Sequence, residues 1–186
     1  MAIDIDIRNT ECIIFYEYKK DDKMILGDPY KFAVSIQKIK DWNIDETFFN
    51  GVLLFFINGI IYPQEIFTAA LNCEIHMLQE KFKNIAFDKE LFYKEKEAAF
   101  QQIYNITFPE DINLDNDYQF DITPLSFSDA NCYIFAVSNN IQVRILAAEL
   151  KYLKENSRHM LENAVVKETF ISVQDMNEIA KALKVY

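Results

Sequence analysis

Glycine is scarce in this chain of 186 residues, which contains only three glycines, four prolines and one tryptophan. Gly27 lies in the stretch MILGDPYKFAVSI, with no second glycine nearby and no Gly-Lys-Ser/Thr ending. A loop that cradles phosphate requires several glycines, or that ending at the start of a helix. The adjacent Asp28-Pro29 pair favours a turn, since proline fixes φ at about −65° and glycine tolerates positive φ. The stretch therefore predicts a corner between two strands.

Cysteine and histidine are also few. Cys12, Cys73 and Cys132 are odd in number and widely spaced, and no Cys-x-x-Cys pair is present. This pattern fits neither a disulfide framework nor a zinc site, so we expect three reduced, buried thiols and no metal. His76 and His159 are the two histidines. Both lie in helix-like segments, and we expect structural or solvent-facing roles for them.

Long apolar runs are absent. The longest, such as residues 52–57 and 132–137, are far shorter than the ~20 residues that cross a bilayer as a helix. The first residues, MAIDIDIRNTEC, do not combine a positive start, an apolar block and a small-residue cleavage site. We therefore expect no membrane span and a cytoplasmic location.

Basic residues are outnumbered, with 19 Lys and Arg against 29 Asp and Glu and a formal net charge of −10. A negative surface repels nucleic acid and anionic membranes, and it speeds encounter with a basic protein. We expect no direct binding to nucleic acid or membrane. Ordinary solubility charge is the alternative explanation.

Alternating and β-branched stretches predict several strands. The clearest is a hairpin over residues 51–62, GVLLFFINGIIY, in which Asn58-Gly59 suits a type I′ turn. A second hairpin is predicted for residues 132–137 and 141–146. Further strands are predicted at residues 2–7, 12–18, 30–39, 118–122 and 169–171, with a solvated turn at residues 19–23.

Helical spacing of apolar residues predicts three helices. Asn72 is expected to cap the first, and Asp88 a second that continues through residue 104. Ser172 and Asp175 form a capping-box pattern before a third, which runs to about residue 184. Residues 147–162 are ambiguous and predicted to be partly helical.

These elements occur in clusters, and both hairpins are antiparallel, which favours an α+β fold over a parallel doubly wound sheet. With 51% hydrophobic residues and no repeat or linker, the chain is predicted to form a single domain over residues 1–186. The sheet is expected to be largely antiparallel, with several packed helices.

The densest charged feature is an acidic tract, residues 110–121 (EDINLDNDYQFD), which contains five carboxylates, two aromatics and no basic residue. Such a surface suits docking of a basic protein. The candidate contact residues are Glu110, Asp111, Asp115, Asp117, Tyr118 and Asp121. A solvated loop that leads into a strand is the alternative interpretation.

The same tract has the alternate spacing of oxygen ligands found in a calcium loop. However, Asn116 occupies the sixth position, where glycine is required, and Ile122 the twelfth, where glutamate is required. This excludes an EF-hand and leaves at most a weak cation site. No Gly-x-Ser-x-Gly elbow or other nucleophile motif is present, so no catalytic residue is proposed and no cofactor is expected.

Several short blocks occur together in a fixed order: ILGDPYKFAVSI, Trp42, NGVLLFFINGIIYP and TAALN, followed by FPED, YQFDITP and CYIFAVSN. In this combination the chain resembles the immunity 42 family of bacterial polymorphic-toxin and contact-dependent inhibition systems. The resemblance extends from Met24 to near the C-terminus. Residues 1–23 precede the point at which family members begin, so they are either an N-terminal extension or the product of a different start site.

The resemblance implies a cytoplasmic antidote, with no turnover and no cofactor, that binds a cognate toxin domain and blocks its active site or substrate surface. Because the chain is acidic, we expect a basic, nuclease-type toxin. Trp42 is a lesser contact candidate and is expected in the core. Two alternatives remain: a hydrolase that uses carboxylates of the acidic tract, and a small-ligand binding or adaptor domain with an aromatic pocket.

Overall fold

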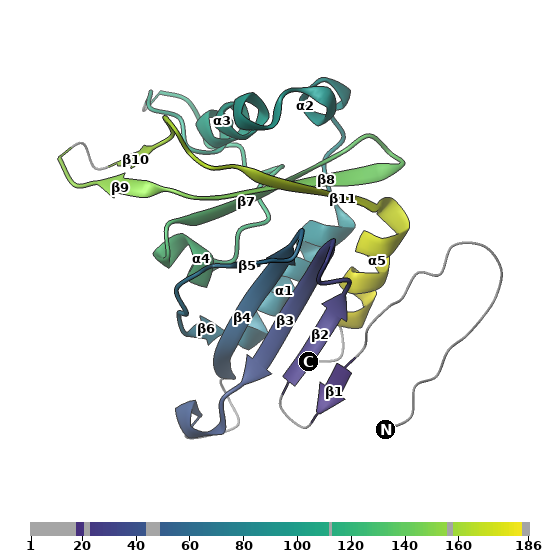
Figure 1. Cartoon of the computed structure of the whole chain (residues 1–186). Helices are drawn as coiled ribbons and strands as arrows, with labels where there is room; N and C mark the ends of the chain where they lie inside the picture. The colour runs from purple at the N-terminus through teal and green to yellow at the C-terminus, as the bar shows by residue number, and fades with distance from the viewer. Residues whose placement is uncertain (1–17, 21–22, 44–48, 112, 156–157, 184–186) are drawn as a thin grey trace.

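The computed structural model describes residues 18–20, 23–43, 49–111, 113–155 and 158–183. Within these ranges, three antiparallel sheets and five α-helices are arranged in layers (Figure 1). Helices and strands are clustered along the chain and do not alternate. This arrangement confirms the predicted α+β class with antiparallel sheets built from hairpins.

The larger sheet, sheet A, has the strand order β1-β2-β3-β4-β5, with β6 paired to β4. Its strands are β1 (Tyr18–Lys20), β2 (Lys23–Gly27), β3 (Phe32–Lys38), β4 (Asn50–Ile57), β5 (Ile60–Tyr62) and β6 (Ala69–Ala70). Along β4, fully buried residues alternate with partly buried ones, so one face of the sheet lies against the core.

Two turns of sheet A have the predicted geometry. Asn58 (φ 51°) and Gly59 (φ 78°) form the connection between β4 and β5, as a type I′ turn requires. Gly27 (φ 98°) ends β2, and the N–H of Asp28 donates to the carbonyl of Phe32 at 3.0 Å. The corner predicted around Gly27 is therefore confirmed.

Sheet B has the strand order β11-β8-β7, and a small third sheet pairs β10 with β9. The strands are β7 (Cys132–Ser138), β8 (Gln142–Glu149), β9 (Lys151–Leu153), β10 (Arg158–Met160) and β11 (Lys167–Ser172). Strands β7 and β8 confirm the second predicted hairpin. Because the chain also forms strands through β10, the partly helical prediction for residues 147–162 is wrong. Ala147 and Ala148 are buried in β8, and sheet pairing overrides their helix propensity.

The helices are α1 (Leu71–Lys83), α2 (Lys89–Tyr93), α3 (Lys96–Thr107), α4 (Leu125–Asp129) and α5 (Val173–Ala182), with a 3-10 turn η1 (Lys40–Trp42). None of the helices in the described ranges is long and apolar enough to cross a membrane. Helix α5 begins with the predicted capping box, because the N–H of Asp175 donates to Ser172 Oγ at 2.9 Å and Asp175 Oδ2 accepts from the Ser172 N–H.

Two helix predictions need correction. Helix α1 starts at Leu71, one residue before the predicted cap Asn72, and its N-cap is Ala70. Asp88 does cap α2, accepting from the Leu91 N–H at 2.9 Å. The helix predicted to continue through residue 104 is nevertheless interrupted, because the backbone becomes extended after α2 and a new N-cap starts α3.

Sheet B lies between two apolar cores. Alternate residues of β7, such as Ile134 and Ala136, pack with sheet A, α1 and α5. The intervening residues, such as Phe135 and Val137, pack with α2 and α3. This double burial explains why β7 reads as an unbroken apolar run in the sequence. Figure 1 shows α2 and α3 above sheet B, and sheet A with α1 below it.

Other predictions have mixed outcomes. Residues 118–122 do not form a strand, and only Asp121 makes an isolated bridge there, to Phe135. The predicted strand at 2–7 and residues 12–17 of the strand predicted at 12–18 lie outside the described residues, and Tyr18 begins β1. In the predicted turn at 19–23, Lys20 pairs with Lys23 in the β1–β2 ladder. Residues 21–22 of that turn are not described.

Two side chains expected in the core lie elsewhere. Trp42 is 42% exposed, since it ends the short turn η1, which follows the end of β3 in the connection to β4. Cys73 lies on the exposed face of α1, whereas Cys132 is a buried free thiol, as predicted. Burial raises the pKa of the Cys132 thiol strongly, which favours its protonated form. Cys12 lies outside the described residues.

Candidate functional site

The acidic tract forms a loop across the C-terminal end of α3. Asn116 Nδ2 donates to the carbonyl of Thr107 at 2.7 Å, and the Asp117 N–H donates to the carbonyl of Ile106 at 3.2 Å. These contacts occupy carbonyl groups that a helix end leaves without intrahelical partners. The end of α3 thus holds the loop, with Glu110, Asp111 and Asp115 exposed.

Two carboxylates of the tract bind their own loop. Asp111 Oδ1 accepts from the backbone N–H of Asn113 at 2.9 Å and from its Nδ2 at 2.8 Å. These bonds, the backbone one first, lower the pKa of Asp111. Asp117 binds Gln119 in the same manner, at 3.1 Å and 2.7 Å. These hydrogen bonds therefore hold both side chains in place on the loop.

The remaining residues of the predicted contact set are in different environments. Glu110 forms an ion pair with Arg158 of β10, and both side chains are exposed. Asp121 is buried below the loop, where Lys81 Nζ lies 3.1 Å from its carboxylate and the Thr123 N–H donates to it at 2.9 Å. The structure thus brings five of the six predicted residues onto one exposed loop and places Asp121 beneath it.

Tyr118 is attached to a buried aromatic cluster. Its exposed ring meets Phe108 edge-on, with ring centroids 6.1 Å apart. Phe108 in turn contacts Tyr104 and Tyr133, at 5.0 Å and 5.4 Å between centroids. The pairs of Phe108 with Tyr118 and with Tyr133 are edge-to-face, which is a preferred arrangement of aromatic rings. Tyr118 is therefore a supported aromatic side chain on the surface of the acidic loop.

His159 has a structural role, as predicted, although it lies in β10 and not in a helix. Its Nδ1 is 2.9 Å from Tyr104 Oη, and its Nε2 is 2.8 Å from Asn131 Oδ1. Burial lowers the pKa of His159, which favours the neutral ring. A neutral ring that accepts from Tyr104 and donates to Asn131 satisfies both bonds. Burial also raises the pKa of Tyr104 to about 12, so its hydroxyl remains a donor.

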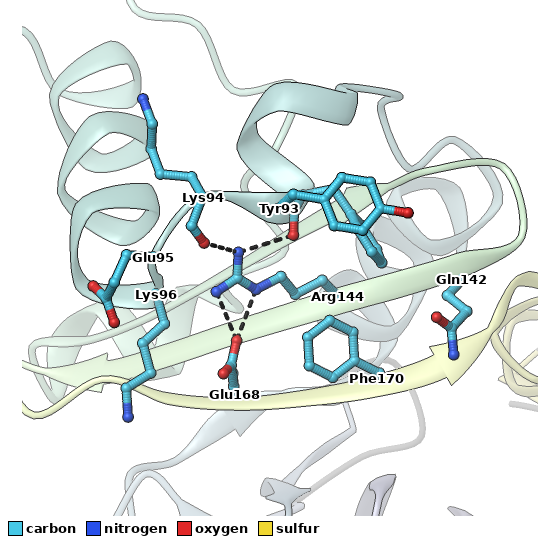
Figure 2. A pocket seen from close by; sticks show the side chains of 9 residues that line it. Tyr93, Lys94, Glu95, Lys96, Gln142, Arg144, Glu168 and Phe170 are labelled. Atoms are coloured by element: carbon cyan, nitrogen blue, oxygen red, sulfur yellow. Dashed lines mark hydrogen bonds and ion pairs between the residues drawn. The ribbon is translucent and has the colours of Figure 1, made fainter.

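A second feature, which the sequence reasoning missed, is an open hollow of about 600 Å³ between the α2–α3 junction and β11 (Figure 2). It is lined by Phe92, Tyr93, Lys94, Glu95, Lys96, Gln142, Arg144, Glu168 and Phe170. In Figure 2, Arg144 of β8 lies centrally, between the junction and the side chains of Glu168 and Phe170 on β11.

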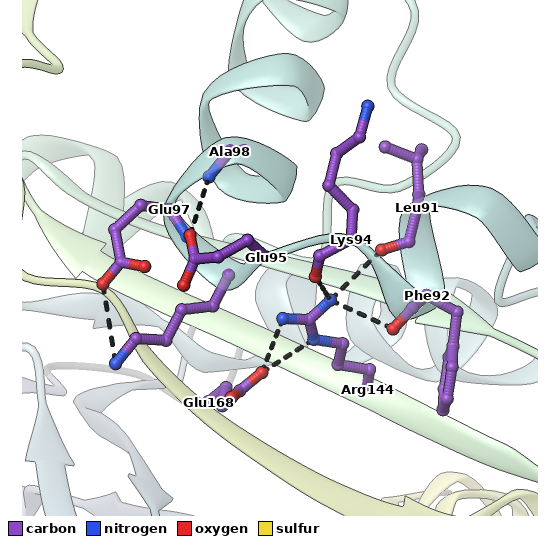
Figure 3. Close-up of polar contacts among 9 residues, drawn as sticks. Leu91, Phe92, Lys94, Glu95, Glu97, Ala98, Arg144 and Glu168 are labelled. Atoms are coloured by element: carbon purple, nitrogen blue, oxygen red, sulfur yellow. Dashed lines mark hydrogen bonds and ion pairs between the residues drawn. The ribbon is translucent and has the colours of Figure 1, made fainter.

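Arg144 fixes the geometry of this hollow. The residue is only 3% exposed. Its Nη1 donates to the carbonyls of Leu91, Phe92 and Lys94, at 3.2, 3.0 and 2.6 Å. Its Nε and Nη2 both contact Glu168 Oε2, at 2.8 and 2.7 Å (Figure 3). The guanidinium therefore ends α2, and this explains the unpredicted break before α3.

Helix α3 begins beside the same group. Glu95 Oε2 accepts from the backbone N–H groups of Glu97 and Ala98, at 2.9 and 3.5 Å (Figure 3). A side-chain hydrogen bond with Glu97 lowers the pKa of Glu95 most, and the backbone bonds lower it further. One end of the hollow is thus a capped helix start.

Aromatic side chains form the wall of the hollow. Phe92 packs edge-on against Tyr93 and Phe170, with centroids 5.1 and 5.7 Å apart. Tyr93 remains 67% exposed and Phe170 40% exposed, and Asn139 Nδ2 donates to Tyr93 Oη at 3.3 Å. Exposed aromatic rings with fixed positions are common anchors in protein interfaces. The sequence signal for this site was an arginine inside the apolar run QVRILAA.

The chemical groups of these two features suit binding. Within the described ranges, no group of three or more His, Cys, Asp or Glu side chains is arranged to hold a metal ion. The described hydrogen bonds of His159 are to tyrosine and asparagine, and none of them is to a serine or a carboxylate. What the surface offers is oriented carboxylates and supported aromatic rings.

Comparison with known families decides the assignment. The profile described as Immunity protein 42 matches residues 24–186. The chain belongs to the Immunity protein 42 family. The first 23 residues lie outside the matched region, and the match begins inside β2. No curated protein matches the chain.

A solved structure shares the fold of this Immunity protein 42 family member. It is the crystal structure of CdiI from Burkholderia dolosa AUO158, with a TM-score of 0.67 and 24% sequence identity. The similarity covers 87% of this chain and 98% of that chain. Nearly the whole of that CdiI chain therefore has a counterpart here.

Proposed function

We propose that this protein binds a cognate bacterial toxin domain in the cytoplasm and neutralises it by covering its active site or substrate surface. The observation that carries the proposal is membership of the Immunity protein 42 family over residues 24–186. The fold shared with a CdiI protein supports it. The partner is the C-terminal domain of a toxin protein, and no cofactor takes part.

The charge of the molecule supports a basic, nuclease-type toxin as that partner. With a net charge of −10, the protein attracts a cationic surface over several ångströms and repels the nucleic acid that a nuclease would bind. The acidic loop carries Asp111 and Asp117 in fixed orientations, and the supported ring of Tyr118 lies beside them. Such a surface speeds association and provides an aromatic anchor.

A binding titration tests the proposal. The toxin candidate is the C-terminal domain of the protein encoded immediately upstream, and a domain from an unrelated toxin system serves as control. We expect a Kd of about 1 nM or lower, equivalent to a binding free energy of ~12 kcal/mol. The Kd should rise as salt is added, because salt screens the attraction between the charges. Equal affinity for the control domain, or no binding, would contradict the proposal.

A further inference from the structure

Strand β11 is an edge of sheet B, since β8 is its only neighbour among the described strands. The direction of its backbone groups follows from the pairing. The N–H of Val173 donates to the carbonyl of Ile141 at 3.1 Å, next to the pair of Ser172 with Gln142. Because backbone direction alternates along a strand, odd-numbered residues of β11 bond to β8. The N–H and C=O groups of Glu168 and Phe170 therefore point away from the sheet.

These outward groups form an open edge. No hydrogen bond within the described part of the chain reaches the backbone groups of Glu168 or Phe170 on that side. The open edge ends at Ser172, because the N–H of Ser172 donates to Asp175 Oδ2 at 3.3 Å. Unpaired backbone groups on an edge strand are a template for another extended segment.

The hollow lies on the side chain face of the same two residues. Phe170 is directly opposite Arg144 in the register, and Glu168 binds the same arginine, so all three side chains share one face. A segment added along β11 would direct every second side chain to that face. Its side chains would thus enter the hollow beside Tyr93 and Phe170.

The chemistry of the hollow favours a basic side chain. Nearby cations are already engaged: Lys94 Nζ lies 2.5 Å from Gln102 Oε1 and points away from the hollow in Figure 2, and Lys96 pairs with Glu97. Glu168 uses Oε2 for Arg144, which leaves Oε1 for a ligand. A free carboxylate oxygen on the same strand face as the ring of Phe170 suits an arginine or lysine.

We infer that the toxin domain is held by strand addition: an extended segment of it pairs with the edge of β11 and places a basic side chain in the hollow. This inference rests on the proposed function and assigns the surface that performs it. The acidic loop at the other end of α3 then serves mainly in electrostatic attraction.

Residue-resolved hydrogen exchange tests the inference in the full-length protein. In the free protein, the amides of Glu168 and Phe170 exchange quickly, while those of Thr169 and Ile171 are protected by β8. Saturation with the upstream-encoded toxin domain slows exchange at 168 and 170 by roughly a hundredfold. A tight complex in which these two amides exchange as in the free protein overturns strand addition while the proposed function stands. Absence of a complex overturns both.

Two substitutions at position 170 distinguish the contribution of the Phe170 ring to toxin binding from that of its backbone N–H. Phe170→Ala removes the aromatic wall and is expected to weaken toxin binding about tenfold. Phe170→Pro also removes the outward N–H, at an edge position where proline is tolerated, and weakens binding by roughly a further fivefold. Val165→Ala, at an exposed residue before β11, is the matched control and leaves Kd unchanged. Equal Kd for the alanine and proline variants contradicts pairing at this amide.

Hydrogen exchange of the free protein, together with sedimentation, tests whether a second copy of this chain occupies the edge. If the amides of Glu168 and Phe170 are already protected in the free protein, and the protein sediments as a dimer, the edge is used for self-association and the inference is wrong. We expect a monomer with both amides unprotected.

Discussion

Two buried charged side chains, Glu74 and Arg144, are stabilised to different degrees. Glu74 in the first turn of α1 is 3% exposed and accepts from Ser126, with its Oε2 2.7 Å from the hydroxyl oxygen. Burial raises the pKa of Glu74 in spite of the bonds from Ser126. Arg144, by contrast, has three carbonyls and a carboxylate around its guanidinium. Burial thus disfavours the charged form of Glu74, whereas hydrogen bonds and an ion pair surround the guanidinium of Arg144.

Glu74 makes stability dependent on pH. Because its pKa is higher in the folded than in the unfolded protein, the folded state holds the proton more tightly. This contribution is fully present below the unfolded pKa and is lost as pH rises through the folded pKa. Urea unfolding from acid to neutral pH should therefore show a decline that Glu74→Gln removes. An identical decline in Glu74→Gln would contradict this account, and Glu65→Gln at an exposed residue is the control.

Arg144 should be a major contributor to stability. Arg144→Met leaves the carbonyls of Leu91, Phe92 and Lys94 without their donor, and we expect the free energy of unfolding to fall by about 3 kcal/mol. Arg158→Met, in an exposed ion pair, should cost less than about 1 kcal/mol. Urea denaturation of both variants measures the difference, and equal losses would be inconsistent with the network in Figure 3.

At the scale of elements, turns and caps decide where strands and helices begin. The corner at Gly27 is the tightest example, because a Cβ there would lie 2.4 Å from the carbonyl oxygen of Phe32 and 2.9 Å from Ile179 Cδ1. At Gly59 the nearest atom would be 3.9 Å away, in the ring of Tyr30. Both glycines have positive φ, so they differ mainly in available space.

This difference gives a paired prediction. Gly27→Ala should destabilise the protein by about 3 kcal/mol or more, because the cost of a positive φ and the cost of the overlap with the Phe32 carbonyl add together. Gly59→Ala should cost only about 1 kcal/mol, the penalty of positive φ alone. Thermal or urea unfolding of the two variants checks the order, and a larger loss for Gly59→Ala would refute it.

Elements with local causes could be predicted from the sequence. The Asn58-Gly59 turn, the Gly27 corner and the Ser172 capping box each depend on residues within a few positions. The break before α3 could not be predicted, because it depends on Arg144, about 50 residues away in sequence. The strands through β10 were missed for the same reason, since pairing partners outweigh local propensity.

The candidate site divides in the same way. The acidic loop was found because charge density is visible in the sequence, although burial of Asp121 beneath it depends on Lys81 of α1. The hollow was not found, because α2, α3, β8 and β11 meet there only in the folded chain. An arginine inside an apolar strand was its one local signal.

At the scale of the whole molecule, the acidic loop and the hollow lie at opposite ends of α3. This helix has 12 residues, so the two features are ~18 Å apart along its axis. A protein interface of standard size, about 800 Å² on each partner, can span both. The proposed binding mode therefore needs only one toxin domain, which the loop would attract and the hollow would hold.

Neutralising the loop should slow association without unfolding the protein. Asp111→Asn, Asp115→Asn and Asp117→Asn together remove three charges while keeping oxygen acceptors in the loop. At low salt we expect the association rate with the toxin domain to fall roughly tenfold, and the difference to vanish at high salt. Stopped-flow association measures both.

The matched control removes three exposed charges elsewhere, through Asp41→Asn, Glu65→Gln and Glu178→Gln. The control has the same net charge as the loop variant. A difference in association rate between the two variants therefore shows that the toxin domain approaches the loop. Equal association rates would show that only total charge matters and would contradict a role for the loop.

The most direct test of the central claim is growth of cells that express the upstream-encoded toxin domain and this protein from separate inducible promoters. Toxin alone should arrest growth, and co-expression of this protein should restore it, while an unrelated toxin domain should remain lethal. Continued arrest by the cognate domain, in cells where this protein accumulates in folded form, would contradict its assignment as the antidote.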